Sequence, residues 1–283
     1  MLMTQSERMK WTLVSCVNNE AVLQSCLLNP SSSVQASEII LQKGFSSAAL
    51  AYNNALDKAN TDVVVFAHQD VFLPHDWEEK FQRSLERLSL LDPQWGVAGV
   101  WGVQSSGHRN GHLYCVGLGA ELGNEACGPV QVRTLDELLL VVRKSSRLRF
   151  DERLPGFHWY ATDICMEAQS HGMKCYAISA FCIHNTNGYN LLPWQFWSNY
   201  LFTRKKWRAE LPITSPCAEV TPWCWPMIRW NIVQAINLLL KRHNPGRRVQ
   251  DPRLLYQDLL RSGRIMAKPN AVYEFGAVEW FSL

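Results

Sequence analysis

The sequence lacks several features that define well-known classes of protein. Its 283 residues contain no apolar run of about 20 residues, the length that a membrane-spanning helix needs. The metal-binding patterns HxH and HExxH are absent, and so are internal repeats and low-complexity linkers. These absences argue against a membrane-spanning protein and against a hydrolase with many metal ligands.

Strong net charge is also missing. The 28 basic and 25 acidic residues leave a formal net charge of +3, which is too small to indicate nucleic-acid binding but suits a phosphate-bearing small molecule. The nine cysteines are odd in number and form no CxxC pair. Residues 1–10 lack the long apolar core of a secretory signal. We therefore expect a reduced, cytoplasmic chain.

The first hundred residues alternate between apolar strands and amphipathic helices. Hydrophobic residues make up 47% of the chain, enough for a sizeable core in one large α/β domain or a domain with an appendage. Strands are expected at 11–17, 38–41, 63–67 and 96–103, and helices at 20–28, 46–59 and 77–88. This order predicts an α/β fold with a doubly wound, mostly parallel sheet and helices on both faces.

The middle of the chain is less regular. Residues 104–131 are rich in glycine and predict a hairpin-like insertion over the sheet edge. The apolar run 138–142 fits a strand or a buried helix, because periodicity alone cannot decide. Thr162 is expected to cap a helix that ends at His171. Two further strands are expected, at 174–179 and 181–184.

The composition shifts near residue 190, which predicts a catalytic domain over 1–190 and a helical extension over 191–283, on the acceptor side or at an interface. An amphipathic helix is expected at 231–242. The extension contains Trp194, Trp197, Trp207, Trp223, Trp225 and Trp230 beside Arg204, Lys205, Lys206 and Arg208. These residues fit a packed core or contact with an anionic membrane surface. Location at the inner surface of the membrane is therefore one possible outcome. Assembly into a homo-oligomer is left open by the sequence.

Two motifs carry the functional prediction. The strand 63–67 delivers His68 and Asp70, two residues apart, to the edge where such sheets bind ligands. The second motif runs from Gly156 to Asp163 and is followed by His184. Together they suggest a metal-assisted transferase site.

Three stretches, taken in order, also match one family pattern. They are Val-Ser-Cys-Val-Asn-Asn-Glu at 14–20, Ala-Tyr-Asn-Asn-Ala-Leu at 51–56 leading to Phe-Ala-His-Gln-Asp at 66–70, and the block 148–163 with His184. Over roughly residues 11–187 the chain resembles family 2-like glycosyltransferases of the GT-A (nucleotide-diphospho-sugar transferase) fold. The stretches are similar to the family's nucleotide-facing turn, its DxD metal motif and its acceptor-side block. His68 stands where the family has the first DxD carboxylate.

The resemblance implies that a sugar passes, with inversion, from a nucleotide-diphospho-sugar to the hydroxyl of a glycan or other acceptor. Asp70 and His184 would bind a divalent metal, Mn²⁺ or Mg²⁺, and an imidazole ligand favours Mn²⁺. His68 would support the metal or bond to a phosphate. Asp163, at a helix start where the macrodipole stabilises a carboxylate, is the expected general base.

The donor-binding residues are also inferred from the resemblance. Val17, Asn19 and Glu20 lie where the family holds the nucleobase and ribose, and Asn53 is counted with them. Asp136, just before the apolar run 138–142, is expected to orient hydroxyls of donor or acceptor. The acidic residue usual after the second strand is not evident near residues 41–43.

Other interpretations compete with this prediction. Taken alone, Asp70 can be a turn former, Asp163 a helix cap and His184 a hydrogen-bonded core histidine. At the level of the whole protein, the alternatives are a non-catalytic GT-A-like nucleotide-binding module and a metal-dependent hydrolase. The hydrolase would use His68 together with those three residues.

Overall fold

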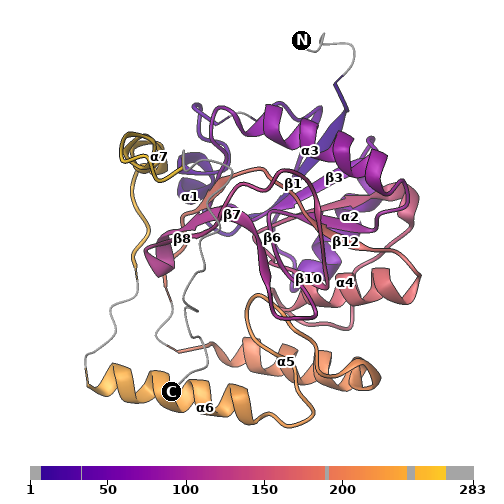
Figure 1. Ribbon diagram of the computed structural model, residues 1–283, viewed down its shortest axis with the longest axis vertical. Coiled ribbons are helices and arrows are strands. Elements are labelled where there is room, and N and C mark those ends of the chain that lie inside the picture. Colours follow the sequence, from indigo (N-terminus) through magenta and orange to yellow (C-terminus); the bar gives the residue numbers. More distant parts are fainter. Residues whose placement is uncertain (1–7, 33, 189–190, 241–245, 266–283) are drawn as a thin grey trace.

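Two β-sheets with helices packed around them form the body of the protein in the computed structural model (Figure 1). The structure describes residues 8–32, 34–188, 191–240 and 246–265.

The larger sheet has seven strands in the order β2-β1-β3-β11-β5-β12-β9. They are β1 (Trp11–Cys16), β2 (Glu38–Gln42), β3 (Val63–Ala67), β5 (Val97–Gly99), β9 (Val130–Val132), β11 (Leu139–Arg143) and β12 (Cys175–Ala177). The apolar run that fitted either a strand or a helix is β11, which runs antiparallel between β3 and β5. The predicted α/β class is confirmed. The sheet is mixed rather than mostly parallel, because β11 and β9 both run against their neighbours.

The smaller sheet follows the order β10-β6-β7-β13-β4, and β8 also pairs with β7. Its strands are β4 (Val71–Phe72), β6 (Trp101–Val103), β7 (Arg109–Cys115), β8 (Ala120–Gly123), β10 (Thr134–Leu135) and β13 (Cys182–His184). β7 pairs antiparallel with β6 and β8, so the predicted hairpin-like insertion is confirmed. The strand expected at 96–103 is divided at Val100 between the two sheets.

Seven α-helices lie in the described residues: α1 (Glu20–Ser25), α2 (Ala48–Lys58), α3 (Trp77–Leu91), α4 (Tyr160–Ser170), α5 (Trp194–Lys206), α6 (Trp225–Leu239) and α7 (Pro252–Arg261). The expected cap at Thr162 is wrong, because α4 begins two residues earlier and the Thr162 hydroxyl bonds to that of Ser215. The helix expected at 231–242 starts earlier, as α6, and residues 241 and 242 lie outside the described residues. Among the described residues, no helix has both the length and the apolar character needed to cross a bilayer.

The central strand β3 explains the layered arrangement. All five of its residues are buried, and successive side chains point to opposite faces of the sheet. Val64 and Phe66 pack in one core with α2 and α4, whereas Val65 packs in the other core with α1 and α3. Helices therefore cover both faces, which explains the continuous apolar sequence of this strand.

Helix α5 belongs to the same core as α2 and α4. Phe196 and Tyr200 of α5 are buried in that cluster, and Met227 of α6 joins them. α5 and α6 lie together at one end of the molecule, with α6 outermost (Figure 1). The domain boundary near residue 190 stays a prediction, and residues 189 and 190 lie outside the described residues.

Candidate functional site

Three potential metal ligands lie together at the carboxyl end of β3. One ligand atom from each of His68, Asp70 and His184 lies within 4.8 Å of the others. β4 and β13 cause this approach, because Val71 pairs directly with His184 in the antiparallel register. Nε2 of His184 lies 3.5 Å from Oδ1 of Asp70. The structure thus brings His68 and Asp70 of the first sequence motif together with His184, which lies far downstream in the sequence.

The protonation states within this cluster follow from burial and charge. Burial lowers the pKa of His68 to about 4, so its imidazole is neutral, the form that binds metal ions. Burial alone would raise the pKa of Asp70, but His184, His68 and Arg248 outweigh it, and the carboxyl stays ionised. Burial opposes the charge of His184, yet Asp70 outweighs this and raises the pKa of that imidazole. His184 must therefore lose a proton before it can bind a metal.

A tyrosine fixes the orientation of His68. The Tyr160 hydroxyl donates to the backbone oxygen of Glu137 at 3.0 Å and lies 2.7 Å from Nε2 of His68. Since the hydroxyl has one proton, Nε2 of His68 is the donor in that second bond. This assignment leaves Nδ1 of His68 as the atom with a free lone pair.

Arg248 is a member of the site that the sequence analysis missed. Its Nη2 lies 3.0 Å from Oδ2 of Asp70, and its Nε donates to the backbone oxygen of Asn185 at 2.8 Å. Asn185 also exchanges two 2.9 Å hydrogen bonds with the backbone of Val249. No motif spacing could have revealed this, because 178 residues separate Arg248 from Asp70.

The backbones of three glycines from distant segments cross in close contact, and this crossing holds the segment that carries Arg248. The backbone of Gly246 bonds to that of Gly117 at 3.0 Å and that of Gly188 at 2.8 Å. A Cβ atom on Gly246 would lie 1.9 Å from the backbone oxygen of Val116. Only glycine permits this approach, which fixes the guanidinium of Arg248 beside the cluster.

Gln69, the middle residue of the His-Gln-Asp motif, ties the motif to the first turn of the fold. Its Oε1 accepts hydrogen bonds from the backbone N–H groups of Asn18 and Asn19 at 3.1 and 3.0 Å. Asn19 in turn caps α1 through the N–H of Val22. Val17 and Asn19, predicted to bind the nucleotide, thus belong to a turn fastened to the motif itself.

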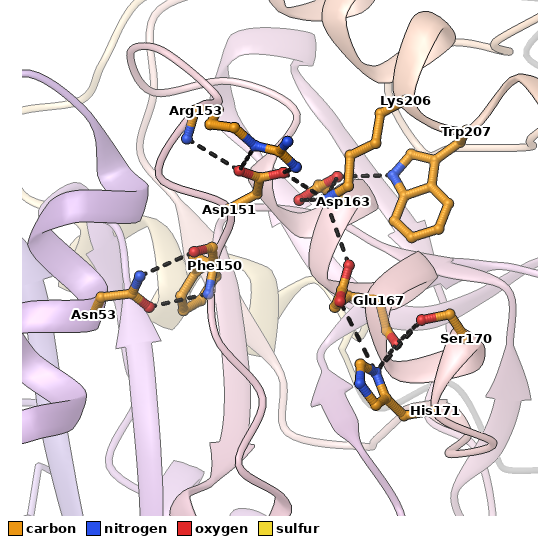
Figure 2. A network of polar contacts seen from close by, with 10 residues as sticks. All are labelled: Asn53, Phe150, Asp151, Arg153, Asp163, Glu167, Ser170, His171, Lys206 and Trp207. Carbon is orange, nitrogen blue, oxygen red and sulfur yellow. Dashed lines mark hydrogen bonds and ion pairs between the residues drawn. The ribbon is translucent and has the colours of Figure 1, made fainter.

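Three other predicted residues have different surroundings. Glu20 forms an exposed 2.8 Å ion pair with Lys43. Asn53 is buried, and its amide holds the backbone N–H and oxygen of Phe150 at 3.0 and 2.9 Å (Figure 2). Asp136 accepts the N–H of Leu138 at 3.0 Å, and its charge acts on the pKa of His68. The polar atoms of Asn53 are therefore occupied in structural bonds, whereas Asp136 lies near the cluster.

Asp163 lies in a separate ionic network, drawn in Figure 2. Its side chain is only 2% exposed, and it accepts hydrogen bonds from Nζ of Lys206 at 2.9 Å and Nε1 of Trp207 at 2.7 Å. Burial raises its pKa in spite of Lys206. Lys206 also reaches Asp151 at 2.9 Å and Glu167 at 3.5 Å. None of these contacts involves the three clustered ligands, and the role of Asp163 as the base stays a prediction.

A glutamate and a histidine lie on the Tyr160 side of the cluster. Nδ1 of His158 lies 3.8 Å from Oε2 of Glu137, and burial raises the pKa of Glu137. Between His158 and Tyr160, Trp159 has a left-handed backbone with φ of 69°. Such strain in a residue other than glycine is often found at functional sites.

The fold and the clustered site together define a GT-A-like α/β protein, and a comparison with protein families agrees. The model described as "Glycosyltransferase like family" matches residues 12–202, more than half of the chain. The chain therefore belongs to the family 2-like glycosyltransferases.

Individual relatives are distant. The chain is 30% identical over 141 residues to "ATP synthase subunits region ORF 6" of Fuscovulum blasticum, covering 47% of this chain and about half, 55%, of that protein. A mannosyltransferase from Pyrobaculum calidifontis, solved with GDP-Man and Mn²⁺, is 14% identical with a TM-score of 0.45 and covers 93% of this chain and 82% of its own. TarS residues 1–349 from S. aureus are 10% identical with a TM-score of 0.40, covering 70% and 65%.

Proposed function

We propose that this glycosyltransferase moves a sugar from a nucleotide-diphospho-sugar to an acceptor hydroxyl, with inversion and with help from a divalent metal. The observation that carries the proposal is the cluster of His68, Asp70 and His184 at the carboxyl end of β3. In α/β sheets this edge is where ligands bind. Membership of a glycosyltransferase family gives the cluster its chemical context.

The cluster fits one metal ion. Ligand atoms at about 2.1 Å from one ion lie at most about 4.2 Å apart. Oδ1 of Asp70 and Nε2 of His184, at 3.5 Å, already meet this limit, and the 4.8 Å spread of the cluster needs only a small side-chain shift. The imidazoles favour Mn²⁺ over Mg²⁺. When bound there, the ion would neutralise the charge that develops on the leaving diphosphate.

Arg248 is proposed to bind the same diphosphate. The two oxygens of Asp70 have different partners, since Oδ1 faces His184 and Oδ2 faces Arg248. A metal ion bound at Oδ1 therefore leaves the ion pair between Oδ2 and Arg248 intact. The planar guanidinium has further N–H donors and is well suited to phosphate oxygens.

The geometry supports His158 over Asp163 as the group that takes the acceptor proton. Asp163 is 2% exposed and bound by two donors, whereas the side chain of His158 is 22% exposed and lies 3.8 Å from the partly buried carboxyl of Glu137. A carboxylate behind an imidazole orients the ring and stabilises its protonated form. We propose that Glu137, 3.8 Å away, stabilises the charge that His158 acquires when it takes the proton.

The two alternatives are less well supported. A two-metal hydrolase needs more ligands than the three that converge in the described part of the chain. A module that only binds nucleotides would require the same donor site, so only turnover separates it from an enzyme.

A thermal-shift experiment tests the metal site. UDP and GDP, each with and without Mn²⁺, should stabilise the protein more when the metal is present, since a ligand at a hundred times its dissociation constant adds about 2.7 kcal/mol. Asp70→Asn should abolish the extra effect of Mn²⁺, because it removes the anionic ligand. Arg248→Met should weaken the effect of the nucleotides.

The matched control is Asp57→Asn, at an exposed carboxylate that pairs with Arg149. This variant should respond like the unaltered protein. An equal Mn²⁺ effect in the Asp70→Asn protein would refute the metal site. In a separate assay with a nucleotide-diphospho-sugar, release of free sugar without any acceptor would instead favour hydrolysis.

A further inference from the structure

Helix α6 has an exposed apolar face along its whole length. Trp225, Ile228, Ile232, Ile236 and Leu239 are all exposed and follow each other at spacings of three, four, four and three residues. On an α-helix this spacing places the five side chains on one side. A stripe of large apolar side chains in contact with water is unusual and marks an interaction surface.

The opposite side of α6 attaches the helix to the protein. Met227 is the buried residue of α6, and it packs in the core that contains Phe196 and Tyr200 of α5. Because Met227 lies across the helix from the five-residue stripe, the stripe points away from the core. The neighbouring α5 adds Trp194 and Leu201, both exposed and seven residues apart.

The charged residues within α5 and α6 are all basic. The sequences of α5 and α6 contain no aspartate or glutamate, but they contain Arg204, Lys205, Lys206 and Arg229. Lys205, Arg229 and the nearby Arg208 are exposed. Arg229 borders the apolar stripe, one residue beyond Ile228.

We propose that this face of α6 binds peripherally to an anionic lipid bilayer, with the apolar stripe in the headgroup region. Apolar side chains with tryptophan at their edge, bordered by basic residues, are the pattern of helices that lie in a membrane interface. Each basic residue near an anionic surface adds to the attraction. This inference does not rest on the proposed sugar transfer.

A second copy of the chain fits the surface less well. In a symmetric dimer the same face meets itself, so the basic residues of α5 and α6 would meet a face on which these two helices supply no acidic partner. An anionic bilayer supplies the missing negative charge.

Vesicle co-sedimentation tests the proposal. The full chain should bind vesicles of phosphatidylcholine mixed with phosphatidylglycerol more strongly than vesicles of phosphatidylcholine alone, and added salt should weaken that binding. The double variant Ile232→Glu/Ile236→Glu should lose about tenfold or more of the binding, because two apolar anchors become charged. Lys205→Gln/Arg208→Gln/Arg229→Gln should lower only the preference for the anionic vesicles.

The matched control is Leu90→Glu/Leu91→Glu, which makes the same kind of change at two exposed leucines of α3, 86% and 60% exposed. This variant should bind vesicles like the unaltered chain, and circular dichroism should show that all variants are folded. Equal vesicle binding by the α6 and α3 variants would overturn the proposal. So would a dimer, seen by light scattering, that the α6 variant alone converts to a monomer while vesicle binding is unchanged.

Discussion

The two acidic side chains singled out from the sequence, Asp70 and Asp163, differ in what surrounds their oxygens. Asp70 shares its oxygens between His184 and Arg248, whose further nitrogen atoms can bind an anionic ligand. Asp163 is 2% exposed and accepts hydrogen bonds from Lys206 and Trp207. A buried carboxylate held in this way has its oxygens occupied by structural partners, and its removal leaves the ammonium group with fewer partners.

The two candidate bases give opposite expectations. His158→Gln should lower turnover by about 10² to 10⁴-fold while donor binding is kept, because the proton acceptor is lost. Asp163→Asn should mainly lower the free energy of unfolding, by about 1–3 kcal/mol, because a charged hydrogen-bond partner is lost. Denaturant unfolding and donor turnover measure the two effects.

His108→Gln, at an exposed position between β6 and β7, is the control and should change neither quantity. If the Asp163→Asn protein keeps full stability but loses turnover, Asp163 rather than His158 is the base.

At the scale of elements, α7 is tied to the start of α3 by one carboxylate. Oδ1 of Asp76 accepts a 2.9 Å hydrogen bond from the Tyr256 hydroxyl, and its Oδ2 lies 3.0 Å from Nζ of Lys80. Burial alone would raise the pKa of Asp76, but Lys80 and Tyr256 outweigh it and the pKa is lowered. Because α7 follows the segment of Arg248, this contact also helps to hold that segment in place.

The lowered pKa of Asp76 predicts a pH-dependent contribution to stability. A group whose pKa is lower in the folded state stabilises the fold above its unfolded pKa of about 3.9 and loses this effect as the pH falls through the folded value. Asp76→Asn should therefore destabilise the protein at neutral pH, and the difference from the unaltered chain should shrink in acid. Urea unfolding between neutral and acidic pH measures it.

Asp258→Asn, at an exposed position on α7 itself, should show no such trend. A difference for Asp76→Asn that grows in acid would contradict the assignment.

For the whole molecule, the sequence could predict what local rules decide. The continuous apolar sequence of β3 placed His68 and Asp70 at a sheet edge, and the structure brings both to one cluster with His184. The direction of β11 could not be predicted, because an apolar run says nothing about which neighbours it pairs with. Partners distant in the chain were also missed, because local patterns do not show which distant residues meet. Lys206 lies 43 residues from Asp163, and Arg248 lies 178 residues from Asp70.

The shared core predicts the fate of a shortened chain. A chain that ends at residue 188 lacks Phe196, Tyr200 and Ile213, which are buried against α2 and α4. Each large apolar side chain contributes about 1.5–3 kcal/mol when buried, so this chain should aggregate or unfold non-cooperatively. A chain that ends at residue 265 keeps every described element and should fold normally. Cooperative thermal unfolding of the 188-residue chain would show instead that the predicted boundary separates two independent domains.

The crossing of Gly117, Gly188 and Gly246 has a consequence for the order of events during translation. Proteins are made from the N-terminus onward, and early segments begin to fold while later ones are still being added. The buried residues of the shared core, up to Ile213, are therefore synthesised before Gly246 and Arg248. A nascent chain that stops between Ile213 and Gly246 contains these core residues together with Asp70 and His184, but it lacks the guanidinium that pairs with Oδ2 of Asp70.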